Sequence, residues 1–311
     1  MQPAELQDLV ARGGACGPAA LRTMVGLLAM MVAEGVLERE DARGLLERLP
    51  GHWPEAPGEV LRQRFVLGAV LGRGTVATVM AARDLRREEA QDPGADVALK
   101  LLNPPMLIDP DARGALFREA RLASRLDHPN ILRVLDWDAE GVLPFLVMAR
   151  LVGQPLSQLA QETAGRGIGW AACVPLGRQI AAALAHAHER LVAHGDLKPD
   201  NLLLTRTGEV VVLDFGAARG LGAGGPVAAF AGFTPRWATA ELAQGAPPEP
   251  ADDLHALATI LYRLATGGRD GPPDRPSGIG RRAWAMLRSS LEPRRATQPP
   301  SARAFAERVL A

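Results

Sequence analysis

Two stretches, His194-Gly195-Asp196-Leu197-Lys198-Pro199-Asp200-Asn201 and Asp214-Phe215-Gly216, decide the fold of this 311-residue chain. Between them lie two apolar runs, 202–205 and 210–213, separated by a glycine-containing turn. Runs rich in Val and Leu on either side of such a turn predict a β-hairpin. A hairpin brings its two ends together, so we expect four polar side chains to converge on one small volume: those of Asp196, Lys198, Asn201 and Asp214.

This set of side chains suits phosphoryl transfer. Carboxylate and amide oxygens bind Mg²⁺, an ammonium group neutralises a moving phosphoryl group, and a carboxylate orients the attacking hydroxyl. The chain has 35 basic residues, and only Lys100 and Lys198 among them are lysines. Lysine is a compact point charge suited to a phosphate, a role in which the planar fork of arginine does not replace it.

The composition predicts a globular, cytoplasmic protein. Hydrophobic residues make up 47% of the chain and charged residues 23%, and the formal net charge is zero. This balance gives no indication of a nucleic-acid partner or an anionic membrane surface. The longest apolar run, 24–33, is too short to span a bilayer, so we expect no membrane insertion. Cys16 and Cys173 form no metal-binding or disulfide pattern.

The first 62 residues predict a helical extension followed by a proline-rich linker. Apolar residues recur at helical spacing over residues 4–49, and Pro50, Pro54 and Pro57 mark the linker. We expect these helices to pack against the domain that follows. A separate regulatory or partner-binding module is the alternative.

From Phe65 the pattern changes to strands. Residues 65–71 and 80–83 predict two strands around a glycine-rich turn, whose glycines let backbone amides approach a phosphate. We expect residues 84–96 to form a polar loop and residues 97–100 a strand that ends on Lys100. Residues 111–125 predict a helix that carries Glu119.

Over residues 63–311 the chain resembles the eukaryotic-like, bacterial-type Ser/Thr protein kinases. The resemblance rests on motifs in the family's order: Gly72-x-Gly74-x-x-Ala77-x-Val79, Val97-Ala98-Leu99-Lys100, Glu119 within Phe117-Arg-Glu-Ala-Arg, His128-Pro-Asn-Ile, His194 to Asn201, Asp214-Phe-Gly, Thr234 to Glu241, and Asp253-Leu-His-Ala-Leu.

The resemblance implies an α+β, bilobal protein-kinase-like fold. It places a small antiparallel β N-lobe with helix αC at 63–150 and a mainly helical C-lobe with a shortened αG region at 151–311, after the helical extension 1–62.

The resemblance also implies the role of each site residue. The catalytic pair would be Asp196, which aligns the substrate hydroxyl, and Lys198, which neutralises the γ-phosphate. Magnesium would be bound by Asn201 and Asp214. ATP would be bound by the glycine-rich loop (Gly72, Gly74, Val79), by Ala98, by Lys100 oriented by Glu119, and by the hinge residues Met148, Ala149 and Leu151.

The chain departs from the family at several positions. Ala77 replaces the third glycine of the loop, and Gly195 replaces the catalytic-loop arginine that in the family receives an activation-loop phosphate. Residues 217–231 contain no Ser, Thr or Tyr. We therefore predict that activation-loop phosphorylation does not switch this protein. Residues 268–280 are too few and too rich in Gly and Pro for a normal αG helix.

We expect an ATP- and Mg²⁺-dependent kinase that phosphorylates Ser or Thr of a protein substrate, with a regulatory partner at residues 1–62 as a further prospect. Two alternatives remain. A pseudokinase scaffold would fit the inert activation loop and the short αG region. A small-molecule phosphotransferase of the antibiotic-kinase type would share the His-Gly-Asp-x-x-x-x-Asn pattern of 194–201. The physiological substrate and the oligomeric state do not follow from the sequence.

Overall fold

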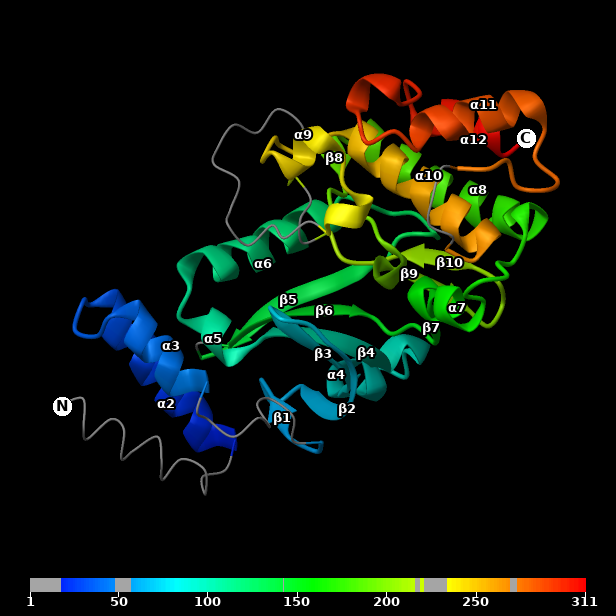
Figure 1. Cartoon of the computed structure of the whole chain (residues 1–311). Helices are drawn as coiled ribbons and strands as arrows, with labels where there is room; N and C mark the ends of the chain where they lie inside the picture. Colours follow the sequence, from blue (N-terminus) through cyan, green and yellow to red (C-terminus); the bar gives the residue numbers. More distant parts are fainter. Residues whose placement is uncertain (1–17, 48–56, 142, 216–218, 221–233, 269–272) are drawn as a thin grey trace. The chain divides into compact units, whose positions relative to one another are not determined.

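The computed structural model describes residues 18–47, 57–141, 143–215, 219–220, 234–268 and 273–311 (Figure 1). The chain divides into two compact units. The first comprises Met1–Ala120 and Val134–Arg150, and the second comprises Arg121–Arg133 and Leu151–Ala311.

The first unit is built on a six-stranded antiparallel sheet in the order β1-β2-β3-β4-β6-β5. Its central strand β4 is paired on both sides, and β6 next to it is buried along almost its whole length, as its run of apolar residues requires. The strands are β1 (Val60–Leu61), β2 (Phe65–Arg73), β3 (Ala77–Asp84), β4 (Asp96–Leu102), β5 (Val134–Glu140) and β6 (Leu143–Ala149).

The helices of the first unit are α2 (Pro18–Ala33), α3 (Arg39–Glu47), α4 (Leu85–Glu89), α5 (Pro104–Leu107) and α6 (Pro110–Ala123), with a short 3₁₀ turn, η1 (Pro93–Ala95). Both α2 and α3 contact α5, and Val25, Leu28 and Leu46 are buried. The described part of the N-terminal segment is therefore helical and packs within this unit. The predicted helix before residue 18 and most of the predicted linker, 48–56, lie outside the described residues.

The prediction of a polar loop over residues 84–96 is wrong over most of its length, because α4 and η1 form there and β4 already begins at Asp96. The carboxylate of Asp84 accepts a hydrogen bond from the main-chain N–H of Arg86, and that of Asp92 accepts one from Gly94. Such N-caps satisfy the otherwise unpaired amides of a first turn, which stabilises short helical segments of polar sequence.

The second unit contains the predicted hairpin, which is confirmed: β9 (Leu202–Thr205) pairs antiparallel with β10 (Val210–Val212). Strand β7 (Gly153–Pro155) extends this sheet along β9, and β8 (Val192–Ala193) pairs with β11 (Arg219–Gly220). Residues 130–132 join the same unit because the main-chain N–H groups of Val212 and Leu132 bond to the carbonyls of Asn130 and Val212.

Helices make up the rest of the second unit. They are α7 (Leu156–Glu162), α8 (Trp170–Glu189), α9 (Ala240–Ala243), α10 (Pro250–Thr266), α11 (Arg281–Ser290) and α12 (Ala302–Val309), with the 3₁₀ turns η2 (Pro199–Asn201), η3 (Pro235–Trp237) and η4 (Arg295–Thr297). None of the helices in the described ranges is long and apolar enough to cross a membrane. In the described residues between Thr266 and Arg281 there is no helix, in line with the shortened region predicted there.

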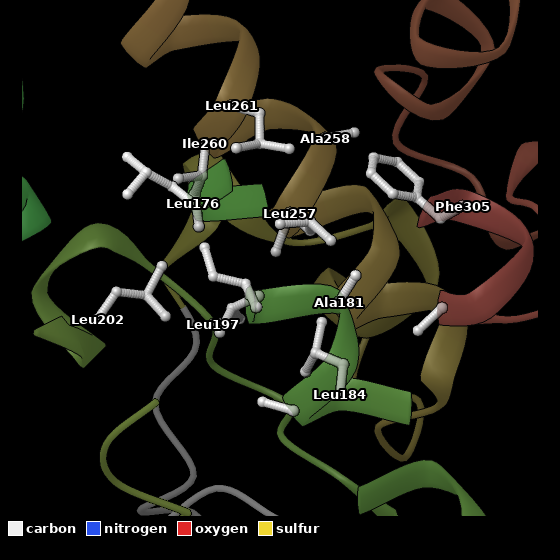
Figure 2. Packing of buried hydrophobic residues seen from close by; sticks show 14 of the residues in the cluster. Leu176, Ala181, Leu184, Leu197, Leu202, Leu257, Ala258, Ile260, Leu261 and Phe305 are labelled. Carbon is white, nitrogen blue, oxygen red and sulfur yellow. The ribbon is translucent and has the colours of Figure 1, made fainter. Parts of the chain in front are cut away.

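The core of the second unit lies between α8, α10 and α12. Figure 2 shows Ala181 and Leu184 of α8 with Leu257 of α10 and Phe305 of α12, all of them buried. The close approach of α8 and α10 uses a glycine: a Cβ added at Gly177 would lie 2.8 Å from Leu261 Cδ1. Leu197 and Leu202, on either side of η2, are part of the same cluster, so the core directly supports the predicted catalytic loop.

A buried ion pair links β2 to β3 in the first unit. The guanidinium of Arg64 donates to both carboxylate oxygens of Asp84, at 3.0 and 2.8 Å, and the Asp84 side chain is fully buried. Burial raises the pKa of Asp84, but the hydrogen bond and charge of Arg64 outweigh it and hold the pKa below its ordinary value.

Replacing Asp84 with Ala leaves the Arg64 guanidinium without its buried partner, so we expect the free energy of unfolding to fall by about 3 kcal/mol, measured by urea denaturation. Arg83→Ala is the matched control, since its pairs with Glu88 and Asp96 are exposed, and removing exposed pairs changes the free energy of unfolding far less. The pKa of Asp84 is lower in the folded than in the unfolded protein. The contribution of the pair to the free energy of unfolding of the wild type is therefore present above about pH 4 and is lost as the pH falls further. Equal losses of unfolding free energy in Asp84→Ala and Arg83→Ala would contradict a stabilising role for the buried pair of Arg64 and Asp84.

Candidate functional site

In the second unit, the carboxylate of Asp196 is held between two side chains. Lys198 Nζ lies 2.6 Å from its Oδ2, while the main-chain N–H and the hydroxyl of Thr234 lie 3.2 and 3.3 Å from its Oδ1. The ammonium of Lys198 is also 3.3 Å from the Thr234 hydroxyl. These contacts form a closed triangle of carboxylate, ammonium and hydroxyl. All three side chains are partly accessible to solvent, which a group that reacts with a substrate requires.

Asn201 attaches the end of the catalytic loop to the hairpin. Its side-chain N–H₂ donates to the main-chain carbonyl of Asp196 at 2.8 Å, so its side-chain oxygen remains an acceptor. Its own carbonyl accepts from the N–H of Leu213 at 2.8 Å. This bond connects the two ends of the hairpin and places Asp214 next to the loop, as the hairpin geometry predicts.

Asp214 has a left-handed backbone, with φ of 51°, and an exposed side chain. Asp is one of the few residues other than Gly that adopt this conformation readily. Its carboxylate and the side-chain oxygen of Asn201 are both hard oxygen ligands, so this donor set fits Mg²⁺. Gly216, the last residue of this motif, lies outside the described residues.

A buried carboxylate on α10 anchors the backbone of the catalytic loop. The two oxygens of Asp253 accept from the main-chain N–H groups of His194 and Gly195, at 2.8 and 2.9 Å. Oδ2 also lies 2.8 Å from Nε2 of His188 on α8. Burial raises the pKa of Asp253, but the hydrogen bond from His188, the charges of His188 and His194 and the Gly195 amide together hold the pKa below its ordinary value.

His194 is a packing and hydrogen-bonding residue. Its Nδ1 accepts from the N–H of Asp196 at 3.3 Å, so Nε2 carries the proton and donates to the carbonyl of Leu213 at 2.9 Å. Its ring centroid lies 4.9 Å from that of Phe215. The histidine thus joins the catalytic loop to the strand that precedes Asp214.

In the first unit, Lys100 on β4 forms an ion pair with Glu119 on α6. Its Nζ lies 2.8 Å from both carboxylate oxygens, and the two side chains are only 13% and 6% exposed. Glu119 faces the sheet, whereas its neighbours Arg118 and Arg121 on the same helix are exposed. A buried, bidentate partner fixes the position of the lysine ammonium.

The register of the sheet places four predicted nucleotide-binding residues on one face. Val79 is opposite Lys100, and Ala98 is opposite Met148. Since Ala98 and Lys100 are two residues apart on β4, their side chains point to the same side. Met148 is buried near the end of β6, and Ala149 is its last residue. Leu151 follows in the second unit.

Glu241, the last residue of the Thr234 to Glu241 motif, is bound by the main chain of Arg295. The main-chain N–H of Arg295 donates to Glu241 Oε1 at 3.2 Å. Its guanidinium instead forms a fork with Asp252 on α10, at 2.9 and 2.8 Å. Asp252 also accepts from the hydroxyl of Thr239 and caps α10. The sequence motifs did not predict this network, for which the acidic pair 252–253 in the first turn of a helix was the available signal.

His128, His186 and Cys173 lie outside the catalytic loop and make packing or hydrogen-bond contacts. Within the described ranges, no group of three or more His, Cys, Asp or Glu side chains could hold a metal. His186 accepts from the N–H of Asp127 and lies against the ring of His128. Burial raises the pKa of Cys173 to about 12, so its thiol stays protonated and unreactive.

Gly195 has a φ of 79°, a left-handed conformation in which a Cβ is strained. We expect Gly195→Ala to lower the free energy of unfolding by about 1 kcal/mol, measured by thermal or urea denaturation. Gly44→Ala is the control: this residue lies inside α3, and an added Cβ would meet no atom within 4 Å. For Gly44→Ala we expect a small increase in the free energy of unfolding. If Gly195→Ala left the free energy of unfolding unchanged, the left-handed backbone conformation would not explain why glycine occupies this position.

Comparisons with known proteins point to one family. A protein kinase domain model matches residues 65–295. The chain is 36% identical over 249 residues to the serine/threonine-protein kinase PkaA of Streptomyces coelicolor, covering 76% of this chain and 44% of that protein. It is 34% identical over 215 residues to the serine/threonine-protein kinase PknB of Mycolicibacterium smegmatis, covering 67% of this chain and 33% of that protein. The chain thus spans less than half the length of these relatives.

A solved structure shows the same arrangement of elements. The PknI kinase domain of Mycobacterium tuberculosis matches with a TM-score of 0.65 and 25% identity, over 82% of this chain and 99% of that domain. Three observations indicate the same family: the antiparallel sheet followed by a helical unit, the sequence motifs, and the match to the protein kinase domain model. The chain therefore belongs to the protein kinase family, and its relatives are bacterial serine/threonine protein kinases.

Proposed function

We propose that this protein is an ATP- and Mg²⁺-dependent kinase that transfers the γ-phosphoryl group of ATP to Ser or Thr hydroxyls of a protein substrate. The cluster of Asp196, Lys198 and Thr234 is the observation that carries the proposal. It combines a carboxylate, an ammonium and a hydroxyl within 3.3 Å of one another. Asp196 and Lys198 come from the loop attached to the core, and Thr234 comes from the start of η3.

Each group in the cluster has a defined task. Asp196 accepts a hydrogen bond from the substrate hydroxyl and orients its oxygen for attack. Lys198, already beside that carboxylate, provides positive charge for the oxygens of the transferred group. The Thr234 hydroxyl and N–H keep the carboxylate in one orientation, which lowers the cost of arranging the reacting groups.

The first unit supplies the nucleotide-binding groups. Lys100, fixed by Glu119, would neutralise the α- and β-phosphates, and Val79 and Ala98 on the same face would contact the adenine. Main-chain groups of Ala149 and Leu151 would hydrogen-bond the base. Asn201 and Asp214 would hold Mg²⁺, which when bound neutralises phosphate charge.

Phosphoryl transfer tests the proposal directly. With labelled ATP, Mg²⁺ and a generic protein substrate, we expect Asp196→Asn to lower kcat by about 10³-fold while ADP binding stays within about twofold. Asp214→Asn should weaken the Mg²⁺-dependent part of ADP binding, because it removes a carboxylate ligand.

Asp200→Asn is the matched control for both variants, because this carboxylate lies in the same loop but is exposed. Its kcat and ADP affinity should equal those of wild type. Wild-type activity in Asp196→Asn would refute the assigned role. A wild-type protein that binds ADP but transfers no phosphate would instead support a scaffold function.

We further propose that phosphorylation of the activation segment does not control the kinase. Gly195 lacks the arginine side chain that would receive a phosphate, and residues 217–231 offer no hydroxyl to modify. Residues 221–231 lie outside the described residues, so this proposal rests on sequence and on the Asp253 anchor, which holds the catalytic loop without a phosphate.

Phosphatase treatment should therefore leave the initial rate within about twofold of a sample treated with heat-inactivated phosphatase, because no charge that orders the loop is removed. The measurement is an initial rate after the phosphatase has been removed. A large loss that is restored by preincubation with ATP would contradict the proposal.

A further inference from the structure

The turn between β2 and β3 is held by one side chain from outside the turn, that of Asn103. Its side-chain N–H₂ donates to the carbonyls of Gly74 and Thr75, at 2.8 and 3.0 Å. Its main-chain N–H donates to the carbonyl of Val76 at 2.9 Å. Three consecutive carbonyls of the glycine-rich turn are therefore bound by a single residue, which directly follows β4.

The side chain of Asn103 is itself held in place. Its oxygen accepts from the hydroxyl of Thr78 at 2.8 Å, and Thr78 is buried on β3. Asn103 is also the N-cap residue of α5, a position where Asn normally bonds to its own helix. Here it makes no such side-chain bond. Its amide is thus committed to the turn, with both donors and the acceptor in use.

The three bonds determine where the amides of the turn point. In a trans peptide unit, the C=O and the N–H of the next residue point in opposite directions. The carbonyls of Gly74 and Thr75 point toward Asn103, so the N–H groups of Thr75 and Val76 point away from it. Neither N–H has a hydrogen-bond partner among the described residues. Two adjacent N–H groups directed to one side form a site for an anion.

We propose that Asn103 is a positioning residue for the nucleotide phosphates. It does not contact the nucleotide; it fixes the carbonyls of the turn and so presents the Thr75 and Val76 amides in advance of binding. Because the turn is already ordered before the nucleotide binds, it loses less conformational entropy on binding than a flexible turn would. The affinity for the phosphates is therefore higher. The inference deepens the proposed function, since it rests on ATP binding by this face of the first unit.

The test compares ligands with and without phosphates. Asn103→Leu keeps a side chain of similar size but removes both donors without adding charge. We expect it to weaken Mg²⁺–ADP binding about tenfold in titration calorimetry, while adenosine binding changes less than about twofold. In the kinase assay, KM for ATP should rise by a similar factor and KM for the protein substrate should not change.

Two further variants guard against a general effect on folding. Thr78→Val removes only the hydroxyl that orients the amide, so ADP binding should weaken by about threefold. Gln158→Leu is the matched control, because it removes an exposed side-chain amide of α7 that bonds only to Glu162. Its ligand affinities should equal those of wild type. Equal losses for ADP and adenosine in Asn103→Leu would overturn the proposal.

A measurement without nucleotide separates this proposal from the proposed function. In the ligand-free protein, backbone ¹⁵N order parameters of Thr75 and Val76 should be close to about 0.85 in wild type and below about 0.6 in Asn103→Leu. Unchanged order parameters would overturn the role of Asn103 even if ATP is bound. Failure of the wild type to bind ATP would refute the proposed function but leave this result interpretable.

Discussion

The structure of the predicted catalytic loop depends on one buried carboxylate, that of Asp253. A fully buried charge is costly unless hydrogen bonds satisfy it, and here the donors are the backbone amides of His194 and Gly195 and the ring of His188. The carboxylate thus joins three parts of the second unit: α10, which carries it, and the catalytic loop and α8, which supply its hydrogen-bond donors. Since none can move without leaving the charge unsatisfied, Asp196 is presented from a rigid base. Its side chain is in turn held by Lys198 and Thr234.

A second buried carboxylate on α10 acts on the segment after the activation loop. Asp252 accepts from the Thr239 hydroxyl and from the guanidinium of Arg295, so α9, α10 and η4 meet at one charge. Asp253 thus fixes the catalytic loop, which precedes residues 217–231 in the chain, and Asp252 fixes Thr239, which follows them. In the described residues this order is achieved with carboxylates and their hydrogen-bond donors.

The first unit follows the same principle with different groups. Lys100 is fixed by Glu119, Arg64 by Asp84, and the glycine-rich turn by Asn103. In each case a flexible element, a long side chain or a glycine-containing backbone, is held by a partner from another strand or helix. The entropy lost on binding a nucleotide is reduced, because much of the order is already present. The glycines that allow amides to approach a phosphate would otherwise leave the turn poorly defined.

The sequence alone determined the hairpin between Asn201 and Asp214, because it follows from residue type and local spacing. The pairing of Lys100 with Glu119 was implied by the resemblance of the sequence motifs to those of the kinase family. Only the tertiary structure decided the roles of Asp253, Arg295 and Asn103. Their partners are 58, 43 and 29 residues away, and polar residues at such positions are equally compatible with a solvated surface. The error over residues 84–96 has a similar cause: a polar segment forms a helix when one carboxylate caps it, and capping is a property of geometry. Side-chain hydrogen bonds need direction as well as composition, and direction is set by packing.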